Sequence, residues 1–151
     1  MLLTRYHRVA VAALQSAGAT VDHSVVGTIL ALWNAPEQQE GHERRAIQAA
    51  LALQEAVRAI GSDLEYAVGV HTGEAQVSNI GTTHAPHYTA IGASVHIATS
   101  LQRKTSPGSI TCSIATLATA GDGLDAVALG PLTIAGQQQG VQAFTVLGIA
   151  P

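Results

Sequence analysis

Apolar and polar positions alternate between residues 64 and 79, and this stretch anchors the interpretation of the chain. Leu64, Tyr66 and Val68 are separated by polar or small residues, which is the period of two expected of a strand with one buried face. Residues 72–74 supply turn chemistry, and the alternation then resumes as far as Asn79. The pattern therefore predicts that the two halves pair as a β-hairpin.

Elsewhere the apolar spacing is helical. From Ile91 to Leu101 apolar residues recur at steps of three and four, which predicts a helix that begins close to Ile91. Residues 43–60 form the clearest helix of the sequence, with one apolar face and one polar face. Further helices are predicted at residues 1–17 and, as a short element, at residues 115–120.

The remaining β-rich runs complete a fold class. They are residues 20–26, 28–33, 109–112, 127–130, 132–134 and 141–147, with Pro131 separating two of them. Trp33 lies in one of these runs and is expected in the core. Helices and strands in this order predict an α+β sandwich, a mostly antiparallel sheet with helices packed on one face, and residues 1–151 are long enough for one such domain.

The composition of the chain limits the classes of partner that it is expected to bind. Only 11% of the residues are charged and the formal charge is −3, so nothing favours binding to nucleic acid or to an anionic membrane. Arg5, His7 and Arg8 interrupt the first apolar run, and no run reaches the about 20 apolar residues of a membrane span. The lone Cys112 is expected to be a buried thiol, and a soluble, cytoplasmic protein is predicted.

Three blocks in the same region carry a family resemblance. Residues 69–74, 79–81 and 88–92 resemble the central motif of the class III adenylate/guanylate cyclase catalytic domain in its bacterial form, and residues 29–36 and 144–148 extend the likeness. The resemblance implies a ferredoxin-like, nucleotide cyclase-like sandwich. It also implies that the family's first strand, which is central in the sheet and carries one of two metal-binding aspartates, is missing ahead of the first helix.

The resemblance implies a reaction and the positions that serve it. The family converts a nucleoside triphosphate to a 3′,5′-cyclic nucleotide and pyrophosphate with two divalent ions, at a site formed by two cyclase domains. In this chain most of the implied positions carry other residues, so no catalytic residue, no metal site and no cofactor are expected, with Mg or Mn implied if the chain is active. The replaced positions are Gly27 for a metal aspartate, His96 and Ser100 for an asparagine and an arginine, Ala135 for a phosphate-contacting lysine and His23 for a base-reading lysine. Thr89 alone remains as a nucleotide-binding candidate, against the base edge, and the pair His23 and Thr89 does not distinguish ATP from GTP.

Three functions remain open at this point. The first is a degenerate, inactive cyclase-homology domain that acts as a regulatory or interaction module in cyclic-nucleotide signalling, in a homodimer or a heterodimer with another cyclase domain. The second is an active adenylate or guanylate cyclase whose recorded N-terminus is truncated, with a nucleoside triphosphate as substrate. The third is a decaying fragment. A separate alternative, a transition-metal site at His84 and His87, rests on the ligand chemistry of imidazole.

Overall fold

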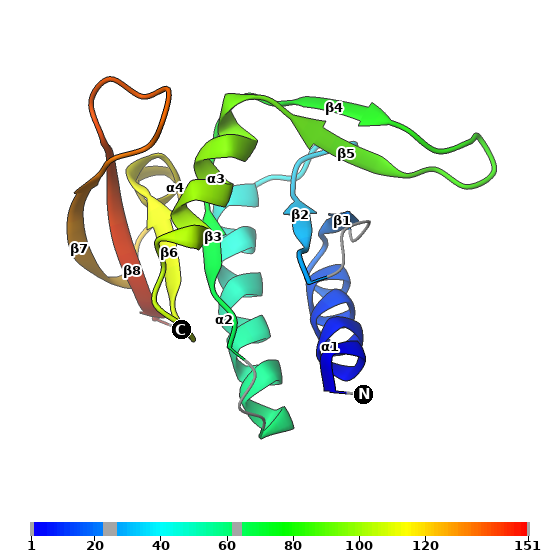
Figure 1. Cartoon of the computed structure of the whole chain (residues 1–151), viewed down its shortest axis with the longest axis horizontal. Helices are drawn as coiled ribbons and strands as arrows, with labels where there is room; N and C mark the ends of the chain where they lie inside the picture. Colours follow the sequence, from blue (N-terminus) through cyan, green and yellow to red (C-terminus); the bar gives the residue numbers. More distant parts are fainter. Residues whose placement is uncertain (1, 23–26, 62–64, 151) are drawn as a thin grey trace.

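The computed structural model describes residues 2–22, 27–61 and 65–150. Predictions that concern Leu64, His23 and the end of the 20–26 run therefore lie outside the described residues. The helices are α1 (Leu2–Ser16), α2 (His42–Ile60), α3 (Ala93–Arg103) and α4 (Ile114–Thr119). The strands are β1 (Thr20–Asp22), β2 (Leu30–Leu32), β3 (Val68–Val70), β4 (Gln76–Asn79), β5 (Tyr88–Ile91), β6 (Ile110–Ser113), β7 (Leu124–Leu132) and β8 (Val141–Ile149). The α+β class is confirmed (Figure 1).

The strands form three separate sheets among the described residues. The largest has the order β3-β6-β8-β7, and β1-β2 and β4-β5 are two-stranded sheets. All pairs are antiparallel except β3 and β6, which pair in parallel with Val68 opposite Ile110. In Figure 1 the β4-β5 hairpin projects from the rest of the molecule.

The hairpin predicted for residues 64–79 is wrong. β3 gives its ladder to β6, whereas β4 pairs with β5, with Val77 opposite Ala90. The β4-β5 pairing is closed by the Asn79 side chain, whose Oδ1 accepts the N–H groups of Gly81 and His87 at 2.9 and 3.0 Å. Alternation identified both strands, but it carries no information about which strand each one pairs with.

Helix α2 holds the two halves of the molecule together. One part of its apolar face packs Leu53 and Val57 against Ala10 and Leu14 of α1. Another part packs Ile47 and Ala50 against the four-stranded sheet, in a cluster that includes Ile110, Cys112 and Val146. The predicted burial of Cys112 is confirmed, because its side chain is fully enclosed. The helix predicted at 43–60 is confirmed as α2. Its buried residues lie on one face, as the apolar spacing of three and four predicted.

The helices lie on both faces of β3, not on one face as predicted. Val68 and Val70 pack against the cluster that contains Ala50 of α2. A Cβ placed on Gly69 would lie 2.5 Å from the carbonyl oxygen of Ala98 in α3. Because neighbouring strand residues point to opposite faces, α2 and α3 cover opposite sides of this strand.

Two element boundaries in the structure differ from the predicted ones, and each difference has a physical cause. Ile91 belongs to β5 and is 60% exposed, and α3 starts two residues later, with Ile97 and Leu101 buried. Strand β7 continues through Pro131, because it is the edge strand of the sheet and its register shifts between Ala128 and Gly130.

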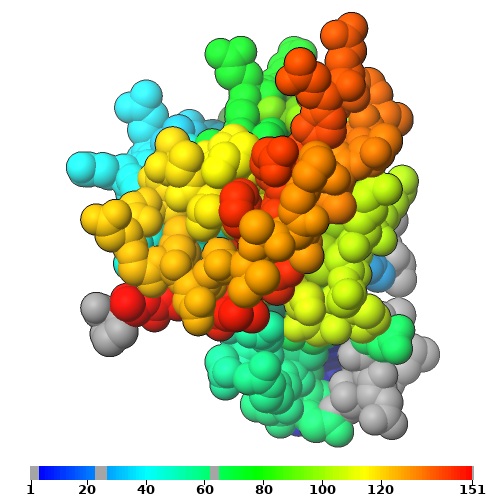
Figure 2. Space-filling view, turned by 90° about the vertical axis from the view of Figure 1, so that its left-hand side faces the viewer, coloured from blue at the N-terminus to red at the C-terminus, as the bar shows by residue number. Residues whose placement is uncertain are grey.

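Figure 2 shows β7, β8 and α4 together on the face they share. No helix in the described residues combines the length and the apolar character of a membrane span.

Candidate functional site

A cleft of about 920 Å³ runs between β2 and β3. The chain from Gly27 to Ala35 lines one wall, and the chain from Glu65 to Ala75 lines the other. Ala46, Ala50 and Leu53 of α2 contribute apolar side chains to the lining. Pockets of this size and character commonly bind ligands in proteins.

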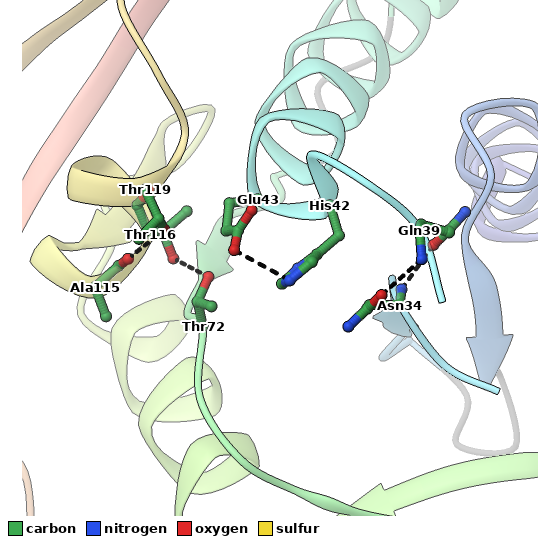
Figure 3. A network of polar contacts seen from close by, with 8 residues as sticks. All are labelled: Asn34, Gln39, His42, Glu43, Thr72, Ala115, Thr116 and Thr119. Carbon is green, nitrogen blue, oxygen red and sulfur yellow. Dashed lines mark hydrogen bonds and ion pairs between the residues drawn. The ribbon is translucent and has the colours of Figure 1, made fainter. Parts of the chain in front are cut away.

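Figure 3 shows polar side chains at the start of α2 and after β3, where His42, Glu43 and Thr72 line the cleft. There His42 Nε2 lies 3.0 Å from the Glu43 carboxylate at the start of α2. The hydroxyl groups of Thr72 and Thr116 are 2.9 Å apart and connect the end of β3 to α4. Thr116 is fully buried, so this contact satisfies a hydroxyl that would otherwise be enclosed without a partner.

Among the predicted site positions that the structure describes, Gly27 alone lines the cleft. It lies in the link between β1 and β2 with a φ of +83°, in the left-handed region that glycine adopts readily. It brings no oxygen or nitrogen donor from a side chain. His23, the other predicted position in this link, lies outside the described residues.

The Thr89 hydroxyl donates a hydrogen bond of 2.6 Å to Asp22 Oδ2. His87 Nε2 lies 2.9 Å from the other carboxylate oxygen, Oδ1, of the same aspartate. The side chain of Asp22 is only 12% exposed, and it lines the cleft. The predicted nucleotide-binding candidate is therefore held at the boundary between β1 and β5 by a carboxylate.

The predicted positions on α3, His96 and Ser100, do not line the cleft. His96 is exposed, and its Nε2 lies 3.1 Å from the carbonyl oxygen of Ala135. These two replaced positions are thus brought together, one from α3 and one from the link between β7 and β8. Ser100 lies one turn further along α3 and is half-buried. None of the three lines the cleft.

His71, which lines the cleft, forms a second polar contact with Ser113. His71 Nδ1 lies 2.6 Å from Ser113 Oγ, and Ser113 is fully buried on β6. Burial lowers the pKa of His71 from its usual 6.5, because the charged imidazolium is desolvated there. Burial also raises the pKa of the neighbouring Cys112 thiol to about 11. Both groups are therefore favoured in their neutral forms, as suits a structural core.

The donor set of the described residues does not fit a two-metal site. Asp22, Glu43, Glu65 and Glu74 line the cleft, yet no group of three or more His, Cys, Asp or Glu in the part of the chain described here is arranged to hold a metal ion. Magnesium prefers several oxygen ligands close together. For the histidine alternative, His84 is exposed, and His84 and His87 belong to no group of three or more possible ligands among the residues that the structure describes.

Sequence reasoning missed Asp22 and the role of His87. Asp22 lies inside the β-rich run predicted at residues 20–26, and nothing in that pattern singles it out. Its contacts come from residues 65 and 67 positions away in the sequence. No local pattern could reveal them. The one available signal was that Asp22 precedes His23, a position already singled out.

Comparison with known proteins gives the family. The model for the Adenylate and Guanylate cyclase catalytic domain matches residues 22–148. The curated protein Adenylate cyclase 1 of Rhizobium meliloti (strain 1021) is 29% identical over 132 residues, which are 81% of this chain and 20% of that protein. The chain therefore spans about a fifth of the length of the curated relative it matches.

Solved structures agree on the fold. The adenylyl cyclase CyaB from P. aeruginosa matches with a TM-score of 0.86 at 23% identity, over 99% of this chain and 82% of that one. The guanylate cyclase domain of RhGC from Catenaria anguillulae, solved in complex with GTP, matches with a TM-score of 0.85 at 20% identity, over 98% of this chain and 82% of that one. The guanylyl cyclase Cya2 matches with a TM-score of 0.80 at 28% identity, over 99% and 80%. The chain belongs to the adenylate and guanylate cyclase catalytic domain family.

Proposed function

We propose that this chain is a degenerate member of the family, inactive as a cyclase on its own, which acts as a regulatory or interaction module in cyclic-nucleotide signalling. The observation that carries the proposal is the cleft, which reaches Gly27 at the position expected for a metal-binding aspartate. Phosphoryl transfer depends on positioning and on neutralising charge with metal ions and cationic side chains. A glycine supplies neither function.

The other predicted positions support the same proposal. Thr89 has one hydroxyl hydrogen, and it is donated to Asp22. His96 contacts the carbonyl of Ala135, where the resemblance expects an asparagine and a lysine that act on substrate. Removing a single group that stabilises charge in a transition state costs about 3–4 kcal/mol. Loss of the metal ligands would remove the mechanism itself.

The partner that we propose is another cyclase domain, in a homodimer or a heterodimer. A relative, the guanylyl cyclase domain of the RhoGC fusion protein from Blastocladiella emersonii, was solved as a non-canonical dimer. The single, buried cysteine fits the cytoplasmic location that we propose with this role.

A direct assay tests the proposal. Purified protein is incubated with ATP or GTP and with magnesium or manganese, and cyclic AMP and cyclic GMP are measured beside an active cyclase domain and a boiled sample. The proposal expects no product above the boiled sample and no saturable heat when nucleotide and metal are titrated in a calorimeter. Cyclic product that scales with protein concentration would overturn it.

A second candidate function is an active nucleotide cyclase whose recorded N-terminus is truncated. It is favoured by family membership and by the curated relative, which is named an adenylate cyclase and of which this chain matches one fifth. The test is to read the coding DNA upstream of the Met1 codon for an in-frame strand with an aspartate, and then to assay the extended protein as above. Activity only in the extended protein would select this candidate.

A further inference from the structure

The link between α3 and β6 carries a group of exposed residues that the proposed function does not use. Arg103 is the last residue of α3, Lys104 caps the helix, and Ser106 and Pro107 follow; all four are exposed. Lys104 is the only lysine of the chain. Within the parts of the chain that the structure describes, neither cation forms an ion pair. Two unpaired positive charges therefore lie three and two residues ahead of an exposed serine.

The two neighbouring hydroxyl groups of this link differ in their contacts. The Thr105 side chain is half-buried, and its hydroxyl donates a hydrogen bond to the carbonyl oxygen of Leu101. The Ser106 side chain is exposed, and its hydroxyl makes no hydrogen bond to any residue that the structure describes. The Ser106 hydroxyl can therefore meet another molecule without losing a contact of the fold, whereas Thr105 would first have to release Leu101.

The backbone around the serine suits an enzyme that binds its substrate as an extended segment. Pro107 biases the residue before it toward extended backbone angles. Arg103 lies in the last turn of α3, and helix ends fray readily. Further along the link, the N–H of Gly108 donates to the carbonyl oxygen of Tyr66 at 2.7 Å. The exposed segment is thus anchored at Gly108 and can open on the side of Arg103.

Phosphoryl transfer to the serine hydroxyl is the chemistry that these neighbours favour. A phosphoserine carries a charge of about −1.5 to −2 near neutral pH and three acceptor oxygens, which pair with guanidinium and ammonium groups. In the transfer, the Ser106 oxygen forms a bond to the γ-phosphorus of a nucleoside triphosphate. The bond from that phosphorus to the bridging oxygen breaks, the nucleoside diphosphate leaves, and the hydroxyl proton is released. The charge that is added offsets the two unpaired cations.

We propose that Ser106 is a phosphorylation site for a protein kinase that recognises an arginine three residues before the serine and a proline directly after it. Arg103 and Pro107 are the recognition residues, and the phosphate that results pairs with Arg103 and Lys104. Because the proposal concerns this link and a separate kinase, it stands or fails independently of the cyclase assay.

The first test uses the protein isolated, with phosphatase inhibitors present, from the cells that make it. Mass spectrometry of the intact chain and of its fragments is expected to find chains with an added phosphoryl group, located on Ser106. Absence of phosphate from Ser106 would overturn the proposal. Phosphate on Thr105 in place of Ser106 would overturn it as well, because the contacts of the two hydroxyl groups would then not decide which one reacts.

The second test asks whether the folded chain is a substrate. The purified protein is incubated with magnesium ATP and a kinase of the specificity given above. Stoichiometric phosphorylation is expected for the wild type and for Thr105→Val, and none at this site for Ser106→Ala. A synthetic peptide with the sequence of residues 100–110 controls for the kinase. Should the peptide be phosphorylated and the folded chain not, the link is closed to the enzyme and the proposal is wrong.

Three further variants test the recognition residues. Arg103→Gln should slow phosphorylation by about tenfold, the factor expected when a charged contact with the kinase is lost. Pro107→Ala should slow it too. Arg8→Gln, which removes an exposed arginine from α1, is the matched control and should react at the wild-type rate. Circular dichroism checks that each variant is folded. Equal rates for all three variants would show that the kinase reads only an exposed serine, and the proposal would fail.

Discussion

Thr89 and Asp22 join β5 to β1 through a 2.6 Å hydrogen bond between residues 67 positions apart. The hydroxyl donates to a carboxylate that is only 12% exposed, which makes the contact charge-assisted. His87 reaches the other oxygen of the same carboxylate. The position that the family resemblance assigns to the base edge thus has a structural role that can be measured.

Thr89→Val should lower the free energy of unfolding by about 1.5 kcal/mol. The value lies at the low end for hydrogen bonds to charged groups because Asp22 keeps its contact with His87. Urea denaturation followed by circular dichroism measures the change. The control is Thr133→Val, at an exposed threonine after β7, which should shift the midpoint little. Equal effects of the two substitutions would show that the bond to Asp22 contributes nothing.

Gly69→Ala should destabilise the fold by about 1–3 kcal/mol. The added Cβ would lie 2.5 Å from the carbonyl oxygen of Ala98 and 2.5 Å from the backbone nitrogen of Gln102, so α3 must move away from β3. Thermal melts compare this variant with Gly148→Ala in β8, where no heavy atom lies within 4 Å of the added carbon. Gly148→Ala should stay within about 0.5 kcal/mol of the wild type. If Gly69→Ala melts with the wild type, the close approach of α3 to β3 is wrong.

Individual elements could be predicted where a single residue pattern decided them. Ala46, Ala50, Leu53 and Val57 of α2 are all buried, because a helical repeat longer than four turns has one consistent apolar face. β1 and β2 lie within the β-rich runs predicted at residues 20–26 and 28–33, and they pair in antiparallel with Val21 opposite Ala31.

Pairing at a distance could not be predicted. Residues 68–70 alternate just as a hairpin strand would, yet their partner, β6, begins 42 positions after Val68, at Ile110. The site has the same limit, since Asp22 meets His87 and Thr89 only through the fold. The family resemblance located Gly27, His96, Ser100, Ala135 and Thr89 in the sequence, but it could not show that His96 and Ala135 touch. Whether these replacements abolish activity remains a prediction for the cyclase assay.

Cys112 should be unreactive in the native protein. Its side chain is fully buried in the cluster between α2 and the sheet, and burial raises the pKa of the thiol to about 11, so the reactive thiolate is scarce near neutral pH. Labelling with an aromatic disulfide reagent at about pH 8 should be fast in denaturant and slow without it. The control is a small free thiol under both conditions. Rapid labelling of the native protein would contradict the packing of β6.

Protonation of His71 should destabilise the protein in mild acid. Burial lowers its pKa in the folded state below 6.5, so in the interval between the lowered value and 6.5 the unfolded chain binds more protons than the folded one. Stability from this group is therefore complete above about pH 6.5 and decreases as the pH falls through that interval.

His71→Asn, which can keep a hydrogen bond to Ser113, removes the titration. Urea midpoints at about pH 7.5 and about pH 5.5 should differ less in this variant than in the wild type. His84→Asn, at an exposed loop residue, is the matched control and should preserve the wild-type difference. If His71→Asn preserves that difference as well, the acid sensitivity arises elsewhere, and burial does not hold His71 in its neutral form.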